Sequence, residues 1–309
     1  VSLEIQHQSG TLEFENLVLT SFLQNESEST VNSFVIRVNP ESIINNQLYK
    51  CTKRYDPKVK TSSHVENILK FNIKETKDEM LDIEETANSD GFFGNYWTPF
   101  KAIYWLARRA LSGSMPEDGS GSDRVGFLFW MTKTGYKFKS IDTIISDGKK
   151  NVVLQNDVIS DNPNFDLYNP RFERDQNIVA QMTNSLYGEK RKYFNLHTLH
   201  DTEEVPFSKS NAKQAHLGDE EEVKLNFDLN ESPTRTTRVA IMDFTMRMDG
   251  TISSGDGEYH PHKVISQSRM RYETLLSKYL RVTVPMNIEL EAGSVINVKL
   301  IKSMGGVDN

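Results

Sequence analysis

Cysteine is almost absent from this sequence of 309 residues, in which Cys51 is the only one. A lone cysteine forms no intrachain disulfide and builds no cysteine-rich zinc site. No run approaches the roughly 18–20 consecutive apolar residues of a membrane span, and the opening residues VSLEIQHQSG do not have the pattern of a signal peptide. We therefore expect a soluble chain without membrane insertion, assembled in a reducing cytoplasm. Because it starts at Val1 and not at Met, we also expect residues to precede it.

Basic residues are also fewer than acidic ones. The chain has 36 Lys and Arg against 43 Asp and Glu, a formal net charge of −7. An acidic chain gains no affinity for nucleic acid from counterion release, so we expect no stable DNA binding, although an acidic wall lets DNA pass without holding it. Aromatic residues are plentiful, with 16 Phe, 11 Tyr and 3 Trp. These need burial in cores or at contacts between subunits.

The first sixty residues alternate between strand-like runs and turn signals. Residues 11–20 (TLEFENLVLT) and 33–38 (SFVIRV) have the composition of strands, and the polar stretch 24–32 links them. This pattern predicts a first β-barrel-like domain over residues 1–60, incomplete at its amino end.

Residues 61–160 have the pattern of an α/β domain. Its clearest element is Thr98–Leu111 (TPFKAIYWLARRAL), where Thr98 is a good N-cap and Pro99 occupies the first helical position. Apolar residues then recur at three- and four-residue spacing, which predicts a helix with one buried face. A further helix is predicted at 61–71.

A hairpin and an acidic stretch complete this domain. Residues 125–131 (VGFLFWM) are apolar on both faces, so we expect a central strand covered by the preceding helix. Residues 136–141 (YKFKSI) alternate and should be half exposed. The acidic stretch 75–90 is expected to be a solvated surface segment, since such charges are seldom buried.

The rest of the chain is harder to interpret. Residues 161–265 predict an irregular, β-rich excursion that contributes strands to a second barrel. Within it we expect a helix at 171–185, strands at 223–229 and 238–248, and a loop at 249–257.

Residues 266–309 predict a helix and a second β-barrel-like domain. The helix covers 268–280, and Ala292-Gly293 is expected to form a turn. Short strands are predicted at 282–284, 288–290 and 295–301. The fold class expected for the whole chain is α+β, with two small antiparallel β-barrel-like domains flanking an α/β middle domain in which a helix packs on an aromatic hairpin.

The residue types of metal sites occur without the spacing that such sites need. His197 and His200 would share a helix face and could bind zinc, but their segment lacks helical periodicity. His260 and His262 flank a proline that forces an extended backbone. The run Asp118–Asp123 fails as a calcium loop, because its twelfth position is phenylalanine in place of the required glutamate.

Catalytic patterns are equally weak. Cys51 is best interpreted as a buried structural thiol, and no serine lies in a Gly-x-Ser-x-Gly elbow. The carboxylate pairs Glu84-Glu85 and Glu203-Glu204 are what 43 acidic residues produce by chance. We therefore expect no enzyme activity, no catalytic residue, no metal and no cofactor.

Interface candidates gather around the predicted helix at 98–111. Trp105 and Leu106 lie off its main apolar stripe, where they meet either another layer of core or a neighbouring subunit. Arg108 and Arg109 lie in its last turn and are expected to be surface charges that complement the helix dipole; an ion pair between subunits is the alternative. The candidates are Trp97, Trp105, Leu106, Arg108 and Arg109.

Two stretches together resemble one protein family. TPFKAIYWLARRAL followed by GFLFWMTKTGYKFKSID is similar to the middle domain of the baseplate central hub proteins of T-even-like contractile-tailed bacteriophages, and SRMRYETLLSKYLRVTVPMNIELEAGSVINVKL is similar to their second barrel. The resemblance covers about half of the chain and rests on pattern.

This resemblance implies a structural virion protein of the tail baseplate. It would form a homotrimer whose six similar barrels adapt the sixfold tail tube to the threefold central spike, contact other baseplate subunits and surround part of the DNA conduit. Two alternatives stay open. One is a cell-wall-degrading, tail-associated hydrolase that uses a carboxylate pair, and the other is a different baseplate subunit of a tail or injection machine.

Overall fold

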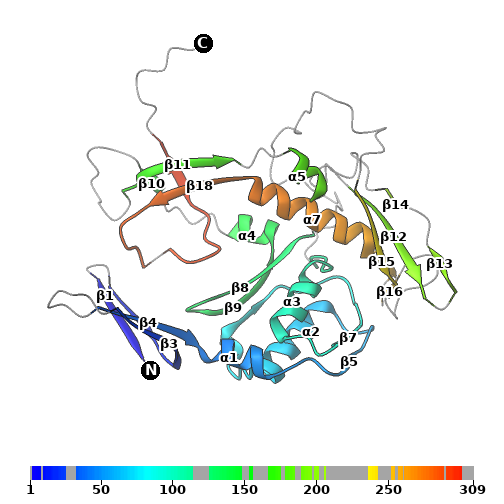
Figure 1. Ribbon diagram of the computed structural model, residues 1–309, viewed down its shortest axis with the longest axis horizontal. Coiled ribbons are helices and arrows are strands. Elements are labelled where there is room, and N and C mark those ends of the chain that lie inside the picture. Colours follow the sequence, from blue (N-terminus) through cyan, green and yellow to red (C-terminus); the bar gives the residue numbers. More distant parts are fainter. Residues whose placement is uncertain are drawn as a thin grey trace, which may run out of the picture.

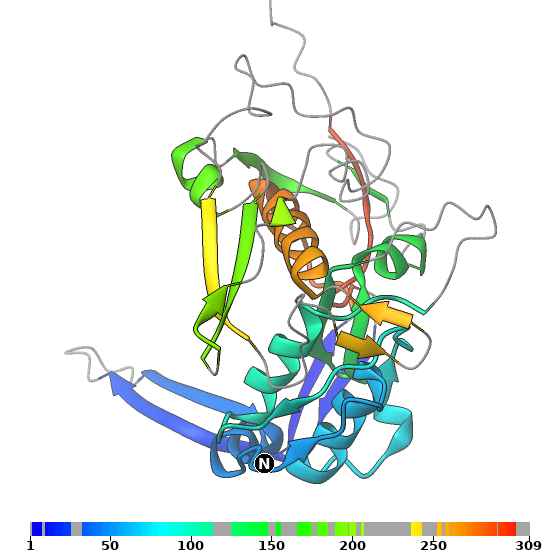
Figure 2. The ribbon, with the colours of Figure 1, turned by 90° about the vertical axis from the view of Figure 1, so that its right-hand side faces the viewer.

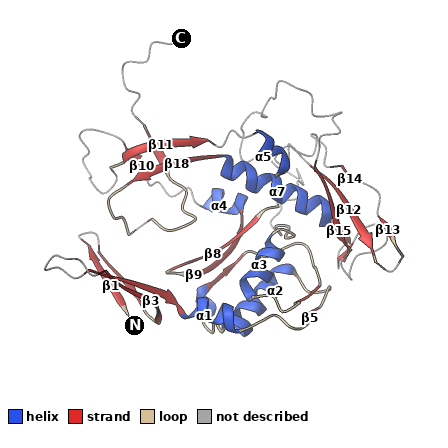
Figure 3. Cartoon of the chain, viewed as in Figure 1, coloured by secondary structure: helices blue, strands red, loops and turns tan. Residues whose placement is uncertain are grey.

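The computed structural model has a mixed α+β fold (Figures 1 and 3). It describes residues 2–7, 10–25, 33–113, 125–147, 153–155, 166–174, 178–184, 189–196, 198–201, 205–206, 236–242, 252–254, 257–259, 261–288 and 290–300. No helix of these ranges is both long and apolar enough to cross a membrane.

The chain begins with two antiparallel ribbons, each of two strands. The first pairs β1 (Leu3–His7) with β2 (Gly10–Phe14), and the second pairs β3 (Leu17–Asn25) with β4 (Ser33–Pro40). The strands predicted in 11–20 and at 33–38 are thus confirmed. Within the ranges described, these strands form separate ribbons, and a closed barrel is not shown.

A compact helical unit follows the ribbons. It contains α1 (Glu41–Leu48), α2 (Thr61–Ile68) and α3 (Pro99–Ala107), together with the short pair β5 (Arg54–Tyr55) and β7 (Phe92–Phe93). Helix α2 continues into a π-helical turn at Leu69–Ile73, and a 3-10 turn at Asp78–Met80 leads into β6 (Leu81–Ile83). The helices predicted at 61–71 and 98–111 are confirmed, whereas α1 had no clear sequence signal.

The start of α3 is fixed by a residue that sequence reasoning missed. Pro99 occupies the first turn as expected, but the Thr98 side chain makes no capping hydrogen bond. Instead the Phe100 amide donates to Oδ1 of the buried Asn46 at 2.8 Å. A side chain of α1 therefore caps α3, which ties the two helices together at a point where backbone donors lack helical partners.

The sheet of this unit has the order β6-β9-β8. The predicted hairpin is present as β8 (Phe127–Thr132) and β9 (Gly135–Ser140), and β9 leads into α4 (Ile141–Asp147). The central strand is β9 and not, as expected, the more apolar β8, because β6 pairs with β9 in parallel on its other side. Helix α3 still covers β8, and the Phe127, Phe138 and Leu106 side chains meet in the main core.

The end of the acidic stretch is buried, which corrects the expectation of a solvated segment. Asp90 is fully buried and pairs with Arg109 at 3.4 Å. The Asn88 amide donates to the Arg109 carbonyl and its Oδ1 accepts from the Leu111 amide, at 3.0 and 2.8 Å. Polar groups can be buried when hydrogen bonds replace their lost hydration, and a sequence does not show where those partners will come from.

The core also contains a histidine that should make the fold sensitive to acid. His64 is buried beside Tyr55 and Phe92, and its ring Nε2–H donates to the Asp56 carbonyl at 2.9 Å. Burial lowers the pKa of His64 below its ordinary value of 6.5, and the hydrogen bonds to backbone carbonyls offset this only in part.

We therefore expect the free energy of unfolding to fall as the pH drops below about 6.5. In that range the unfolded chain binds a proton that the folded chain does not, and the loss continues down to the lower folded pKa. Urea unfolding between pH about 7 and 5 measures it, with a His64→Phe variant for comparison. An equally steep decline in the variant would show that His64 is not the cause.

The carboxyl half surrounds one long helix, α7 (Pro261–Ser277), which crosses above β8 and β9 in Figure 1. The ribbon of β11 (Tyr168–Arg174) and β18 (Lys278–Thr283) lies at one end of it, and β10 (Val153–Gln155) pairs in parallel with β19 (Asn297–Lys299). Helix α5 (Ile178–Thr183) lies near α7.

A second sheet lies beside the other end of α7. It centres on β12 (Glu189–Asn195), which pairs with β13 (His200–Asp201), β14 (Val205–Pro206) and β15 (Thr236–Ile241). A small hairpin of β16 (Ile252–Ser254) and β17 (Gly257–Tyr259) precedes α7.

Several boundaries predicted in this half were wrong. Residues 171–174 are strand and not helix, because they pair with β18; the helix there is restricted to α5. The expected loop at 249–257 contains β16. Helix α7 starts at Pro261, seven residues earlier than predicted, since proline is well suited to the first helical position. Leu290 is outside any strand, and the strand predicted at 223–229 lies outside the described residues.

Candidate assembly surfaces

The ribbon β3–β4 exposes apolar side chains on both of its faces. Phe22 lies opposite Ile36, and the adjacent pair is Leu23 opposite Val35. Successive residues of a strand point to opposite faces, so the two pairs lie on opposite sides of the ribbon. Their side chains are 44–57% exposed. A ribbon of two strands is marginally stable in water, so burial of both faces against other protein would stabilise it.

The two faces of the ribbon β1–β2 differ, since one is apolar and the other carries glutamates. Leu3 and Ile5 pair with Phe14 and Leu12 on one face, whereas Glu4 lies opposite Glu13 on the other. A Cβ added to Gly10, at the turn, would lie 3.3 Å from Cδ1 of Ile288. Gly10, the first residue of β2, therefore lies beside Ile288 in the segment that precedes β19.

An apolar groove lies between α3, β8 and α7. Its volume is about 260 Å³. It is lined by Tyr104, Ala107, Arg108, Phe127, Leu128, Phe129, Tyr272, Leu275 and Leu276. Tyr104, Leu275 and Leu276 are exposed along its walls. The Tyr272 hydroxyl donates to the Phe127 carbonyl at 2.5 Å, and burial raises the pKa of this tyrosine. The groove is thus built on a fixed contact between α7 and β8.

A group of arginines surrounds one buried carboxylate near this groove. Glu189 is fully buried and accepts from Arg191 Nε at 2.7 Å and Arg238 Nε at 3.0 Å, while Arg269 Nη1 lies 3.7 Å away. The Ser266 hydroxyl also donates to Glu189, at 2.7 Å. Burial lowers the pKa of the Arg269 guanidinium, and so does repulsion by Arg238, Arg191 and Arg108.

This arginine group (Arg191, Arg238 and Arg269) therefore surrounds the buried carboxylate of Glu189. Its members come from β12, β15 and α7, which are distant in sequence, so the sequence carries no signal for it. Arg108 lines the groove, and its charge lies close enough to Arg269 to contribute to the lowered pKa of that residue.

The structure separates the five interface candidates. Leu106 and Arg109 are buried within the chain, so their side chains are not available to a neighbour; Arg109 pairs with Asp90 and stacks on Trp105, with its Cζ 3.8 Å from the ring centroid. The expectation that Arg109 is a surface charge was wrong. Trp97 and Trp105 pack partly buried on the core, and Arg108 is exposed.

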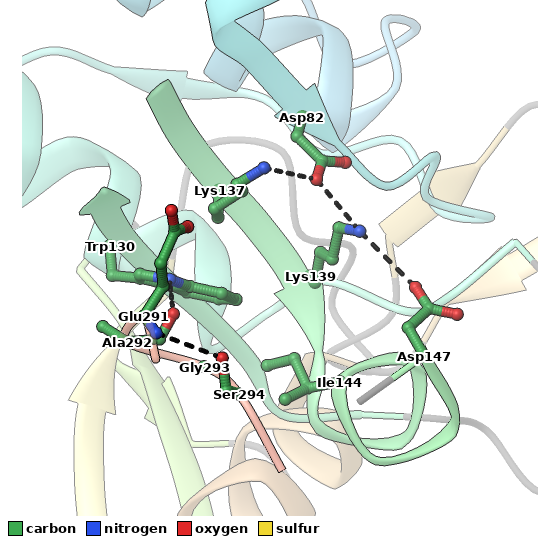
Figure 4. A pocket seen from close by; sticks show the side chains of 10 residues that line it. All are labelled: Asp82, Trp130, Lys137, Lys139, Ile144, Asp147, Glu291, Ala292, Gly293 and Ser294. Atoms are coloured by element: carbon green, nitrogen blue, oxygen red, sulfur yellow. Dashed lines mark hydrogen bonds and ion pairs between the residues drawn. The ribbon is translucent and has the colours of Figure 1, made fainter. Parts of the chain in front are cut away.

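A second pocket marks the joint between the hairpin β8–β9 and the loop before β19 (Figure 4). Trp130 Nε1–H donates to the Ala292 carbonyl at 2.9 Å. Beside it, Lys137 and Lys139 both lie 3.0 Å from Asp82. Burial would raise the pKa of Asp82, but the hydrogen bonds from the two lysines outweigh it and lower this pKa. The two lysines thus compensate the carboxylate of Asp82 in this pocket, as expected of a structural joint.

Replacing Gly293 by alanine is expected to loosen this joint. The predicted turn is confirmed, with the Ser294 amide donating to the Glu291 carbonyl, and Gly293 has φ +89°. An added Cβ would lie 2.6 Å from Cζ2 of Trp130, and the ring is held by its own hydrogen bond. Strain and overpacking should cost about 1–3 kcal/mol in thermal unfolding. No loss, combined with unchanged tryptophan fluorescence, would contradict this.

The metal and catalytic candidates do not converge in the part of the chain that is described. No group of three potential ligands is present there. The backbone of His200 lies in β13 and that of His262 in α7, while His197, His260, Glu203, Glu204 and the run 118–123 lie outside the described side chains. Glu84 accepts from the Ser140 amide at 2.7 Å, whereas Glu85 pairs with Lys60. Cys51 is buried, as expected of a structural thiol.

The sequence matches no protein-family model and no curated protein sequence. Among solved structures, the chain is similar to the tail protein from Neisseria meningitidis MC58, with a TM-score of 0.45 and 8% sequence identity. The similarity covers 92% of this chain and 69% of that chain. At 8% identity, no residue role passes from that protein to this one.

Proposed function

We propose that this chain is a structural subunit that works by assembling with copies of itself and with other proteins. The observation that carries the proposal is the ribbon β3–β4, whose two faces present Phe22, Ile36, Leu23 and Val35 to solvent. Exposed apolar surface of this kind marks protein contacts. In a hydrolase we would instead expect a carboxyl group in an apolar pocket with a raised pKa, whereas no Asp or Glu is among the described residues that line the apolar groove between α3, β8 and α7.

The more specific proposal is a trimeric hub in the baseplate of a contractile phage tail, between the sixfold tail tube and the threefold central spike. It is supported by the resemblance of the Thr98–Asp142 and Ser268–Leu300 stretches to such hubs. In this role the chain has no chemistry of its own. The net charge of −7 suits a conduit wall past which DNA slides without binding.

Mass photometry and low-resolution images of the purified protein test this proposal. We expect a trimer that forms a threefold ring with a central hole, and acidic side chains along its axis. A Phe22→Ser/Ile36→Ser double variant should shift the population toward monomer, because it removes apolar surface from one ribbon face.

A Leu48→Ser variant is the matched control, since Leu48 is also exposed but lies at the end of α1. It should leave the trimer intact. A wild-type chain that stays monomeric at high concentration, even with a spike partner, would rule out the hub. Peptidoglycan cleavage that is lost on changing one carboxylate would favour the hydrolase.

A further inference from the structure

We infer that the glutamate face of the ribbon β1–β2 of one copy docks on a basic, aromatic patch beside β5 and β7 of a neighbouring copy. The patch consists of Lys53, Arg54, Phe71, Lys74, Phe93 and Tyr96, all of which are exposed. This inference rests on the proposed self-association and names the two surfaces that make it. Because the surfaces differ, the contact is heterologous, and such contacts close into rings when the rotation between neighbours allows it.

Basic residues are concentrated around this patch, although the chain as a whole is acidic. Residues 50–77 contain eight Lys and Arg against three Asp and Glu, in a chain with a net charge of −7. Lys60 and Lys70 already pair with carboxylates. Lys53 and Lys74 instead lie over aromatic rings, with Nζ 5.5 and 4.3 Å from a ring centroid. An aromatic ring does not neutralise a cation, so the patch remains positively charged.

A strained loop holds the aromatic part of the patch in place. Asn95 and Tyr96 have φ angles of 46° and 56°, which residues other than glycine seldom adopt. The Gly94 amide donates to the Lys53 carbonyl at 3.1 Å. The Tyr96 amide donates to the Cys51 carbonyl at 3.0 Å. These bonds fix a conformation that leaves Tyr96 76% exposed. Backbone strain is typical of functional sites, and tyrosine is enriched in protein contacts.

Two phenylalanines lie beside the cations of the patch. Phe93 is opposite Arg54 in the register of β7 with β5, and Phe71 lies next to Lys53. Both rings are well exposed. When a partner covers them they exclude water from the neighbouring charges, and ion pairs are stronger where water is excluded.

The ribbon β1–β2 has the opposite charge. The first 36 residues contain five glutamates and no lysine or arginine. Glu4 lies directly opposite Glu13 in the register of the ribbon, and both side chains are exposed. Like charges directly opposite each other destabilise a strand pair. A lysine of a neighbouring copy beside Glu4 and Glu13 would offset their repulsion, so the ribbon gains stability on docking.

The ribbon and the patch lie at opposite ends of the amino-terminal half. Figure 1 shows β1 at the left and the pair β5–β7 at the right, on the side that faces the viewer in Figure 2. The ribbon therefore reaches the patch of a neighbour and not that of its own chain. Copies with a net charge of −7 repel one another in most orientations, and complementary charge selects the head-to-tail orientation.

Charge exchange tests the inference. Lys53→Glu should weaken the association of copies about tenfold or more in sedimentation velocity, because it places like charges together. Glu13→Lys should weaken it similarly, although it removes the repulsion within the ribbon, and combining the two changes should restore it. Tyr96→Asn should also weaken the association, since asparagine tolerates the positive φ but offers no ring.

Lys299→Glu is the control, as it makes the same charge change at an exposed residue of β19, outside the patch. It should leave the association unchanged, and circular dichroism should show all variants folded. Association that Lys53→Glu leaves intact, or that the combined variant fails to restore, overturns this inference and not the proposed function. An equal loss with Lys299→Glu also overturns it, because the charge effect would then not be local. A wild-type chain that never associates overturns both.

Discussion

Replacing Asp142 by alanine is expected to lower the free energy of unfolding by about 3–5 kcal/mol. Arg271 of α7 is only 2% exposed, and its guanidinium donates to both carboxylate oxygens of Asp142 in α4, at 2.6 and 2.7 Å. It also donates to the Val125 carbonyl at 2.6 Å. Without Asp142, a buried cation remains with no charge to balance it, and the contact of α7 with α4 and the start of β8 is weakened.

Urea unfolding followed by circular dichroism measures this loss. Asp147→Ala is the matched control, because this carboxylate lies on the same helix, is well exposed and lies 3.5 Å from Lys139. An exposed pair contributes about 0–1 kcal/mol. Combining Asp142→Ala with Arg271→Met should recover part of the stability, since it removes the uncompensated charge. If Asp142→Ala were no more harmful than Asp147→Ala, the buried pair could not be what holds α7.

Replacing Glu189 by glutamine is expected to have an effect of the same size, about 3–5 kcal/mol. The change keeps the shape of the side chain but removes the carboxylate that Arg191, Arg238 and Arg269 surround. The three guanidiniums then repel one another in a partly buried setting. Because Arg191 and Arg238 lie on the sheet and Arg269 on α7, the sheet around β12 should detach from the helix first.

Hydrogen exchange would locate this effect, with faster exchange expected in β12 and β15 and little change in α2 and α3. Asp201→Asn is the control, because Asp201 pairs with Lys192 on the same sheet but is exposed. That pair lowers the pKa of Asp201, mainly through the hydrogen bond from Lys192. Loss of the Asp201–Lys192 pair should leave hydrogen exchange in β12 and β15 slow. Uniform faster exchange throughout the Glu189→Gln variant would contradict a local role.

Local sequence signals determined the elements whose stability is itself local. Pro99 and the spacing of apolar residues located α3, and the apolar run at 127–131 located the first strand of the hairpin. The adjacent apolar residues Phe22-Leu23 and Val35-Ile36 could also have indicated a ribbon that is apolar on both faces, since neighbours in a strand point to opposite sides.

Other features depended on partners from distant parts of the chain. Residues 171–174 became a strand only because β18 lies beside them, and β9 became central only because β6 pairs with it. The interface candidates differ in exposure for the same reason. Arg109 is buried because it pairs with the buried Asp90, whereas Arg108 lines the groove.

The sequence alone thus determined the α+β class, the helix and hairpin of the middle unit, and an acidic amino-terminal stretch without lysine or arginine. Only the tertiary structure decided that three arginines from distant segments surround Glu189 and that an apolar groove lies between α3, β8 and α7. The physical reason is that helix and strand patterns arise from neighbours along the chain, whereas a charged group or a groove arises from neighbours in space.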